Sequence, residues 1–410
     1  MGPGRRMESD MSQDRRDDGY DAVVVGGRVA GASTALLLAR AGHRVAVLDR
    51  VRFPSDTLST HLIWPSGVIQ LRRWGLLEAI EAAGTPMLPT IRSDVDGTAV
   101  EFPVWAESGV EAVCAPRRTV LDPTILAAAE SAGVAVFEGV TVDGLSRDGR
   151  GRIDGVVGHR DDGRPLRIAA GVVVGAAGWR SRVARDAGAA AYDERQPSNA
   201  IHYAYWSGLE NRGVELWFHT RGLMAGVFPT NGGACVYVNC RSARSGELRR
   251  DVDRNYLRFV AEAAPDLAAR LARATRTSPV RGTPGLPGFV RRAHGPGWVL
   301  VGDAGCTNDP ASAHGITAAL RDAELAAVAI DAGIRDPATA EEALQAFEAA
   351  RDRSRPLYDL GWAIATYEWD APTVLELLTR FSVELIREAQ ETAVLPARSG
   401  PLRAPTLRGA

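Results

Sequence analysis

The chain contains no lysine. All 48 basic residues among its 410 residues are arginine, and 50 acidic residues bring the formal net charge to −2. Any mechanism that depends on a lysine amine is thereby excluded. The nearly balanced charge also gives no general attraction to nucleic acid or to an anionic membrane surface.

Cysteine and long apolar runs are scarce as well. The four cysteines are Cys114, Cys235, Cys240 and Cys306. They form no Cys-x-x-Cys pair and no Cys/His ligand spacing, so we expect neither a metal site nor a disulfide framework. No apolar run approaches the roughly 18–20 residues of a spanning helix. We therefore expect a cytoplasmic protein without a membrane span, in which residues 1–19 are a disordered arm and residues 396–410 a disordered tail.

Residues 21–50 have the pattern of a β-α-β unit. Buried-strand runs at 22–25 and 45–48 flank a segment with helical spacing at 31–41. Gly26 permits a tight turn, and Gly31 lets the helix lie close to the strand. The free N–H groups at the start of that helix attract a pyrophosphate, and Asp49 stands where a carboxylate accepts hydrogen bonds from a ribose. The unit predicts an ADP-like ligand, with Gly27 and Arg50 beside it.

Arg28 departs from the dinucleotide-binding fingerprint, because it stands where the second glycine is usual. The backbone then approaches the phosphates in one of two ways. Either the Arg28 side chain points away from them, or its guanidinium pairs with them.

Two further strand–turn–helix segments follow. The segment 299–317 delivers Asp303 to a turn, where its carboxylate can accept a hydrogen bond from a ribityl hydroxyl or simply cap a helix. The N–H groups of Gly315 and Ile316 are expected at the flavin edge where negative charge develops on reduction. The segment 175–185 carries arginines in its turn.

In this order and at these separations, the three segments resemble the FAD-dependent monooxygenases of the p-hydroxybenzoate hydroxylase type, the group A flavoproteins. The chain is most similar to their geranylgeranyl-reductase-like oxidoreductase branch, in which Gly-x-Arg-x-Ala-Gly is common. Segments 53–61, 117–122 and 205–209 add to the resemblance, which runs from about residue 20 to residue 355.

The resemblance implies an α/β fold. A Rossmann-like FAD-binding domain of the glutathione-reductase-type ββα kind would be interleaved with an antiparallel-sheet substrate domain and followed by a helical C-terminus. The FAD-binding domain is expected at 20–85, 115–185 and 290–335. The substrate-binding sheet is expected at 86–114 and 186–289, and the C-terminal helices at 336–395.

FAD is the implied cofactor. Its implied contacts are Gly26, Gly27, Arg28, Gly31, Asp49, Arg50, Arg118, Val142, Asp303, Pro310, Gly315 and Ile316. Arg118 would reach the pyrophosphate or the ribityl chain, or else be an ordinary arginine at a helix end. Val142 would contact the adenine through its backbone.

Histidines and aromatic residues supply the other site candidates. His61 lies in a stretch that is near the isoalloxazine in this family, and it is either the proton-transfer residue or a hydrogen-bonded loop histidine. His314 lies beside the flavin or caps the helix that follows. With His314, three residues on alternating strands, His202, Tyr205 and Trp217, are expected to line the substrate cleft.

The implied reaction begins with reduction of FAD by NAD(P)H. O2 then forms a C4a-hydroperoxyflavin, which oxygenates a small aromatic or natural-product substrate. Ala177 replaces the aspartate of the family's Asp-Gly fingerprint, so NADH, NADPH and a separate reductase all stay open as the electron source. We expect a hydrophobic small-molecule substrate, no nucleic-acid partner, and a monomer or homodimer.

Three alternatives to oxygenation follow from the same residues. The first is a geranylgeranyl-reductase-type FAD reductase or dehydrogenase that does not use oxygen. The second, flavin-dependent halogenation, requires a lysine and a Trp-x-Trp-x-Ile-Pro segment, and the chain has neither. The third is a flavin-binding protein without catalysis.

Overall fold

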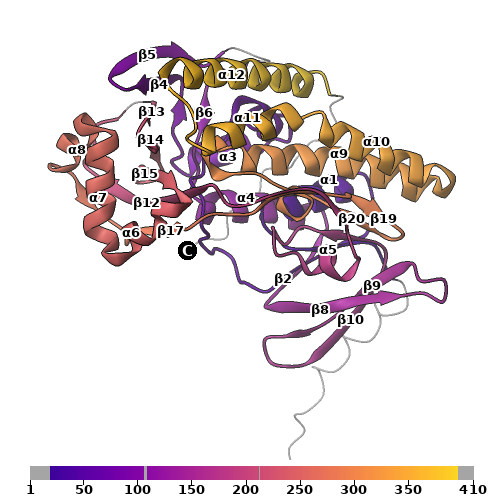
Figure 1. Cartoon of the computed structure of the whole chain (residues 1–410). Helices are drawn as coiled ribbons and strands as arrows, with labels where there is room; N and C mark the ends of the chain where they lie inside the picture. Colours follow the sequence, from indigo (N-terminus) through magenta and orange to yellow (C-terminus); the bar gives the residue numbers. More distant parts are fainter. Residues whose placement is uncertain (1–18, 106–108, 212, 396–410) are drawn as a thin grey trace, which may run out of the picture.

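The computed structural model describes residues 19–105, 109–211 and 213–395. The expected tail and nearly all of the expected arm lie outside these residues. Within them, no helix is long and apolar enough to cross a membrane. The elements form an α/β arrangement in which a parallel sheet, a second sheet and a set of C-terminal helices pack together (Figure 1).

The parallel sheet carries the first β-α-β unit. Its parallel strands lie in the order β20 (Trp298–Leu300), β10 (Pro165–Gly175), β1 (Tyr20–Val25), β2 (Val45–Asp49) and β7 (Ala135–Glu138). The short β19 (His294–Gly295) pairs antiparallel with β20 at the edge. All of β1 from Ala22 to Val25 is buried, as the uninterrupted apolar run predicts for a strand that is covered on both faces.

Different layers cover the two faces of this sheet. Helices pack on one face: α1 (Val29–Arg40), α4 (Arg118–Ser131) and α9 (Gly315–Arg335). The other face packs against an antiparallel meander and a short helix: β8 (Val140–Arg147), β9 (Ile153–Arg160), the first part of β10, and α5 (Arg182–Asp186). This three-layer ββα arrangement confirms the expected fold class.

The second sheet has the order β16-β12-β15-β14-β13-β4-β5, and β17 also pairs with β12. Its bounds are β4 (Thr90–Val95), β5 (Thr98–Pro103), β12 (Asn199–Ser207), β13 (Val214–His219), β14 (Leu223–Thr230), β15 (Gly233–Arg241), β16 (Thr275–Arg276) and β17 (Arg281–Thr283). Its pairs are antiparallel except β13 with β4. Two small sheets complete the strands: β11 (Ala191–Arg195), β18 (Gly288–Arg291) and β21 (Cys306–Thr307), and β3 (Met87–Leu88) with β6 (Val113–Cys114).

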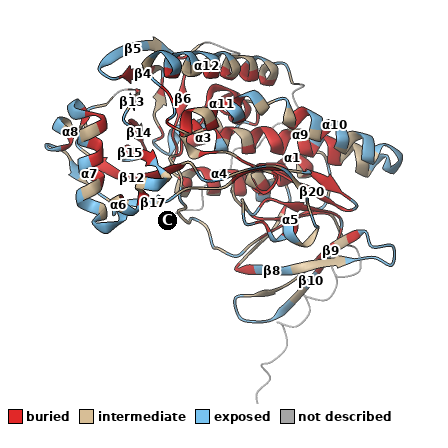
Figure 2. Ribbon diagram, in the orientation of Figure 1, coloured by how far each residue is buried: buried red, intermediate tan, exposed pale blue. Residues whose placement is uncertain are grey.

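The alternating apolar runs from about residue 200 to 290 predict antiparallel strands, but this segment of the expected sheet domain also contains helices. Three helices form there: α6 (Ser245–Arg250), α7 (Val252–Ala263) and α8 (Pro265–Leu271). Tyr256, Phe259, Val260 and Ala263 are the buried residues of α7, and their spacing is that of one helical face. These helices cover the outer face of the second sheet (Figures 1 and 2).

The amphipathic pattern of residues 67–83 predicts one helix, and the structure differs there. The segment is broken at Gly75, whose φ is +70°, into α2 (Pro65–Arg73) and α3 (Leu77–Ala82). The C-terminal region contains α10 (Ala340–Asp352), α11 (Arg355–Ala365) and α12 (Ala371–Ala393). The long α12 packs beside α2 and α11 and reaches β4, so the last described helix is part of the body of the protein (Figure 1).

Candidate cofactor site

The turn between β1 and α1 is built from glycines that packing requires. Gly26 has a φ of +109°, and a Cβ there would lie 2.6 Å from the carbonyl oxygen of Ala176. A Cβ on Gly31 would lie only 1.8 Å from the carbonyl oxygen of Gly26. The first turn of α1 therefore lies directly on the strand–turn backbone, with its N–H groups at the end of the parallel sheet.

Asp49 ends β2 with its carboxylate held by backbone donors. The Gly27 N–H donates to Oδ2 at 2.7 Å, and the Val51 N–H donates to Oδ1 at 2.9 Å. A carboxylate offers about four lone-pair positions, so acceptor capacity remains for a ribose diol. Arg50, the next residue, is exposed, and Val142 lies on β8, which packs beside β2.

The Arg28 side chain points to neighbouring protein groups. Its guanidinium donates to the Asp122 Oδ2 at 2.5 Å and to the Ser55 hydroxyl at 2.9 Å. The Arg118 Nε donates to the other carboxylate oxygen of Asp122 at 2.9 Å. One fully buried carboxylate thus joins two arginines from distant parts of the chain.

Asp122 has a different role from the one that its sequence context suggested. Asp122 followed by Pro123 is a typical sequence at a helix start, but α4 begins at Arg118 and Asp122 lies one turn inside it. The spacing of four residues places the Asp122 carboxylate against Arg118 on the same helix face.

Arg118 also lies near Asp303, although the two residues are far apart in sequence. Burial raises the pKa of Asp303 to about 6, and the positive charge of Arg118 opposes that rise. Asp303 belongs to a short 3-10 turn (Gly302–Ala304) and does not cap α9, whose N-cap residue is His314. The three segments that carried the sequence argument therefore converge at one end of the parallel sheet.

The amino end of α9 faces open space. Gly315 is exposed, and a Cβ added there would meet nothing within 4 Å. Pro310 lies in the preceding 3-10 turn (Pro310–Ser312), and Ile316 is half-buried in the first turn of α9. This open end fits the edge of a planar ring that gains negative charge on reduction.

Two hydrogen bonds join the segment that contains His61 to the amino end of α9. The Trp64 backbone N–H donates to the Thr317 hydroxyl at 3.0 Å, and the Trp64 indole donates to the Ser312 carbonyl at 3.1 Å. His61 has a φ of +68°, and its ring is buried. The backbone around His61 is therefore held in an unusual conformation next to the start of α9.

His61 is part of a buried aromatic cluster. Its Nε2 is hydrogen-bonded to the Tyr205 hydroxyl, and the two rings stack with centroids 5.7 Å apart. Tyr203 meets the His61 ring edge-on at 6.3 Å. Burial, followed by the charges of Arg118 and Arg117, lowers the pKa of His61 to about 3. Its Nδ1 is buried and has no hydrogen-bond partner among the residues that the structure describes.

Arginines border this cluster. The Arg117 guanidinium lies 3.9 Å from the centre of the Tyr205 ring and donates to Asp56 at 3.4 Å. Arg281, from β17, donates to the same Asp56 oxygen at 2.8 Å. Neither Arg117 nor Asp56 was among the expected site residues, although each lies in a segment, 117–122 or 53–61, that adds to the family resemblance.

The structure does not bring the expected substrate-cleft residues together. Tyr205 faces the cluster with His61, but His202 and Trp217 lie on the opposite face of the second sheet, toward α6–α8. Burial lowers the pKa of His202 to about 4. Because side chains alternate along a strand, residues 202 and 205 of β12 cannot share a face, whereas Tyr203 and Tyr205 do. His314 points elsewhere again, to Glu388 of α12 at 2.9 Å.

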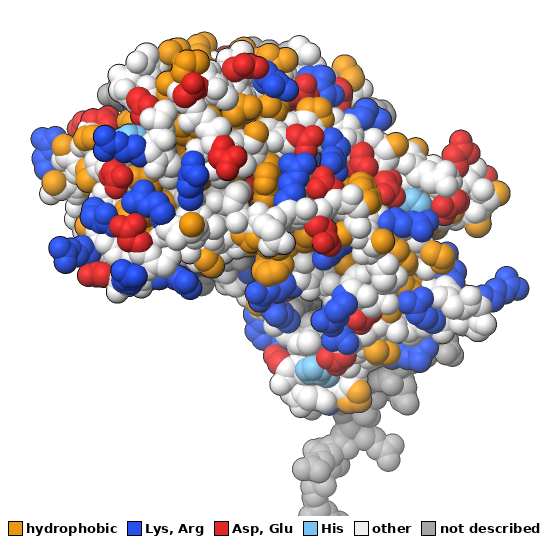
Figure 3. Space-filling model, viewed as in Figure 1, with side chains coloured by type: hydrophobic (Ala, Val, Ile, Leu, Met, Phe, Trp, Pro, Cys, Tyr) orange, Lys and Arg blue, Asp and Glu red, His pale blue; other side chains and the backbone are white. Residues whose placement is uncertain are grey.

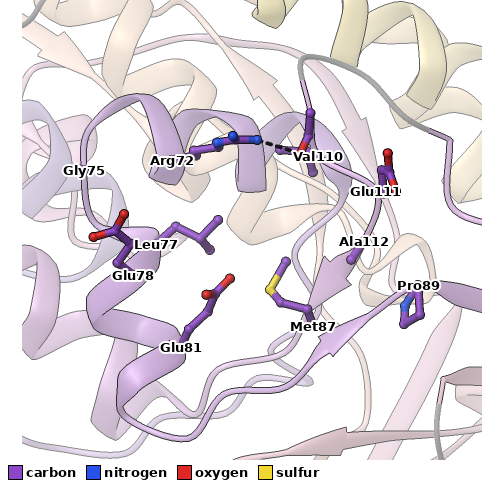
Figure 4. A pocket seen from close by; sticks show the side chains of 11 residues that line it. Arg72, Gly75, Leu77, Glu78, Glu81, Met87, Pro89, Val110, Glu111 and Ala112 are labelled. Atoms are coloured by element: carbon purple, nitrogen blue, oxygen red, sulfur yellow. Dashed lines mark hydrogen bonds between the residues drawn. The ribbon is translucent and has the colours of Figure 1, made fainter.

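Two cavities lie apart from the His61 cluster. One, of about 570 Å³, lies beside α2 and α3, and Arg72 crosses its rim to donate to the Gly109 carbonyl (Figure 4). The other, of about 400 Å³, is next to α5 and is lined by Trp179, Arg180, Arg185 and Arg291 among others. The face of the molecule drawn in Figure 3 mixes positive and negative side chains without a large field of one sign.

Comparison with known proteins identifies the family. Residues 19–357 match the family described as FAD binding domain, and the chain belongs to it. It is therefore an FAD-dependent oxidoreductase, and the expected family is confirmed. The turn at Gly26, the carboxylate of Asp49, the neighbouring Arg118 and Asp303, and the open end of α9 fit this cofactor.

The chain is also similar to proteins whose names state different activities. Menaquinone reductase of Mycolicibacterium smegmatis is 28% identical over 335 residues, which are 76% of each chain. The structure of PqsL, a probable FAD-dependent monooxygenase from Pseudomonas aeruginosa, matches with a TM-score of 0.72 and 26% identity over 90% of this chain and 99% of that one. A triple mutant of the flavin-dependent brominase Bmp2 has a TM-score of 0.78 at 18% identity, over 92% and 96% of the two chains, which shows the shared fold.

Proposed function

We propose that this chain is an FAD-dependent monooxygenase that uses NAD(P)H and O2 to oxygenate a small, hydrophobic, aromatic substrate. In one turnover, NAD(P)H, a proton, O2 and the substrate give NAD(P)+, the oxygenated product and water. The observation that carries the proposal is the buried His61–Tyr205 pair, which the Trp64 hydrogen bonds fasten to the open end of α9. Because both rings are buried, water would be kept from the reacting atoms there.

The cofactor would be held at both ends. Gly26, Gly31 and the first turn of α1 would receive the pyrophosphate, and Asp49 the ribose. Arg118 and Asp303 would hold the ribityl region, and the Gly315 and Ile316 N–H groups the flavin edge. FAD, when bound, accepts hydride from the nicotinamide and activates O2.

His61 would accept or donate a proton at this site through Nδ1, because Nε2 is already hydrogen-bonded to the Tyr205 hydroxyl. A histidine with a pKa of about 3 is neutral at physiological pH and a weak base. After burial, the causes of that low pKa are the charges of Arg118 and Arg117, and Arg118 is one of the residues proposed to hold the cofactor. Negative charge on a bound cofactor would offset them and bring the histidine nearer to a useful range.

The cavity beside α5 supports a nucleotide as electron donor. Arg180 and Arg291 have no carboxylate within ion-pair distance among the described residues, while Arg185 contacts Asp186. Arg291 also donates to the Ala304 carbonyl, next to Asp303, so the cavity borders the proposed cofactor site. Guanidinium groups bind phosphates, and the Trp179 indole offers a flat apolar surface for a base.

The decisive experiment measures the stoichiometry of the FAD-loaded protein. NADPH or NADH oxidation, O2 consumption and product are followed with p-hydroxybenzoate, anthranilate and menadione as probes. Oxygen uptake matched to a product that carries isotopic label from O2 supports the monooxygenase. Substrate turnover that continues unchanged under nitrogen refutes it.

The nucleotide cavity is tested separately with Arg180→Gln and Arg291→Gln. Loss of both cations is expected to raise KM for NADPH roughly tenfold or more with little change in kcat, because about 1.4 kcal/mol of phosphate binding is removed. Arg292→Gln is the matched control, since Arg292 is exposed, follows Arg291 directly and does not line the cavity. An unchanged KM in the double variant would remove this cavity from the proposal.

The second candidate is an FAD reductase that does not use oxygen. The similarity to a menaquinone reductase over three quarters of the chain favours it, as does Ala177 in place of the usual aspartate. Anaerobic reduction of menadione by NADPH at the full aerobic rate, without oxygenated product, is the result that selects this candidate.

A further inference from the structure

A buried carboxylate from the last described helix reaches the amino end of α9. Glu388 of α12 is 1% exposed. Its Oε2 accepts from the His314 Nε2 at 2.9 Å and from the Ser66 hydroxyl at 2.8 Å. Its Oε1 accepts from the Ser354 hydroxyl at 3.2 Å and lies 3.8 Å from the Arg321 Nε. One side chain thus joins α2, α9 and the residue that precedes α11.

The hydrogen-bond partners determine the protonation of Glu388. Burial alone raises its pKa, but His314, Arg321 and Ser66 together lower the pKa of Glu388 to about 2. An ionised carboxylate only accepts hydrogen bonds, so the shared proton lies on the Nε2 of His314. Glu388 thereby fixes both the ring orientation and the tautomer of this histidine.

His314 lies where its charge distribution matters most for a bound flavin. It is the N-cap residue of α9 and directly precedes the exposed Gly315. The loop before it is also held in place, because Ala313 has a φ of +49° and the Trp64 indole binds the Ser312 carbonyl. Glu388 itself lies beyond residue 357, where the match to the FAD-binding family ends.

We propose that Glu388 is a positioning residue for the flavin site: it orients His314 at the start of α9 and, through His314, stabilises negative charge on the reduced flavin. This inference rests on the proposed placement of the flavin at α9. The hydrogen bond of 2.9 Å from the His314 Nε2 to Glu388 holds this N-cap residue, and the first turn of α9 that follows it, in one position. The free N–H groups and the dipole at this helix end favour the reduced, anionic state of the cofactor.

The test is the midpoint potential of bound FAD in Glu388→Gln, measured with the full chain by dye equilibration. We expect reduced flavin to bind about tenfold more weakly relative to oxidised flavin, which corresponds to a potential lower by about 30 mV. His314→Gln is expected to lower the potential as well. Because Glu388 acts through His314, the double variant should fall no further than the lower of the two single variants.

A matched control separates this role from helix packing. Glu324 is another buried carboxylate that joins α9 to α2, and it accepts from the Gln70 side chain at 2.9 Å and pairs with Arg73 at 3.0 Å. It lies well inside α9, about three turns from His314. Glu324→Gln should lower thermal stability as Glu388→Gln does, but leave the flavin potential and visible spectrum as in the wild type.

The outcomes are distinct. A Glu388→Gln protein with the wild-type potential and spectrum overturns the inference, as do effects of Glu388 and His314 that simply add. If Glu388→Gln does not fold, His314→Gln alone decides, and an unchanged potential in that variant overturns the inference. Wild-type protein that binds no FAD at this site instead refutes the proposed function, a result visible before any variant is measured.

Discussion

Replacing Gly31 by alanine tests the packing on which the proposed pyrophosphate site depends. The added Cβ would lie 1.8 Å from the Gly26 carbonyl oxygen, whereas such contacts are essentially never below 3.0 Å. The first turn of α1 must therefore move by about 1.2 Å away from the β1–α1 turn. We expect this overpacking to lower the free energy of unfolding by roughly 3 kcal/mol.

The same displacement should weaken FAD binding. A shift of this size misaligns about two N–H donors with the pyrophosphate, each worth roughly 1.5 kcal/mol, so the Kd for FAD rises about 100-fold. Urea unfolding of the apoprotein and fluorescence titration with FAD measure the two effects. Gly246→Ala in α6 is the matched control, because a Cβ there meets nothing within 4 Å, and it should be neutral or stabilising by about 0.5–1 kcal/mol. Wild-type stability and FAD affinity in Gly31→Ala would refute the reasoning.

Three further predictions concern buried polar groups around this site. Asp122→Asn removes the carboxylate that Arg28 and Arg118 share. Because the two arginine side chains are 24% and 11% exposed, we expect the free energy of unfolding to fall by about 2 kcal/mol rather than by the full cost of a buried pair. Urea unfolding measures this change. His61 has a pKa of about 3 in the folded state, below its unfolded value near 6.5. Between these two pH values the unfolded state binds more protons than the folded state. The free energy of unfolding therefore falls as the pH falls through this range, by up to about 1.4 kcal/mol per pH unit. His61→Gln lacks this contribution, so its stability should fall less steeply with falling pH than that of the wild type. Coincident slopes of the wild-type and variant curves would contradict the assignment. Tyr205→Phe keeps the stacked ring but leaves His61 without its hydroxyl partner, and we expect about a tenfold lower yield of product per NADPH oxidised, with unchanged FAD content.

Local chain geometry could be predicted from the sequence with few errors. The β-α-β unit, the turn at Gly26, the close approach at Gly31 and the carboxylate at the end of β2 all appear as expected. Each depends on residues within about 25 positions of one another, where strand and helix periodicity and glycine conformation decide the structure. The sequence did not predict the helix α7, although its apolar residues have helical spacing, because the alternating strand patterns on either side of it predict strands for the whole of 200–290.

The chain by itself therefore determined the family, the ββα architecture and the segments that would meet FAD. Only the tertiary structure decided which residues of these segments contact one another. Asp122 neutralises Arg28 across 94 positions, and Glu388 holds His314 across 74. The faces that His202 and Tyr205 occupy depend on which side of the second sheet α6–α8 cover. The physical reason is that a buried charge is stabilised by a partner that is near in space but can be far away in sequence. The environment of a strand residue likewise depends on which layer packs against its face of the sheet. Neither relation produces a periodic pattern in the sequence.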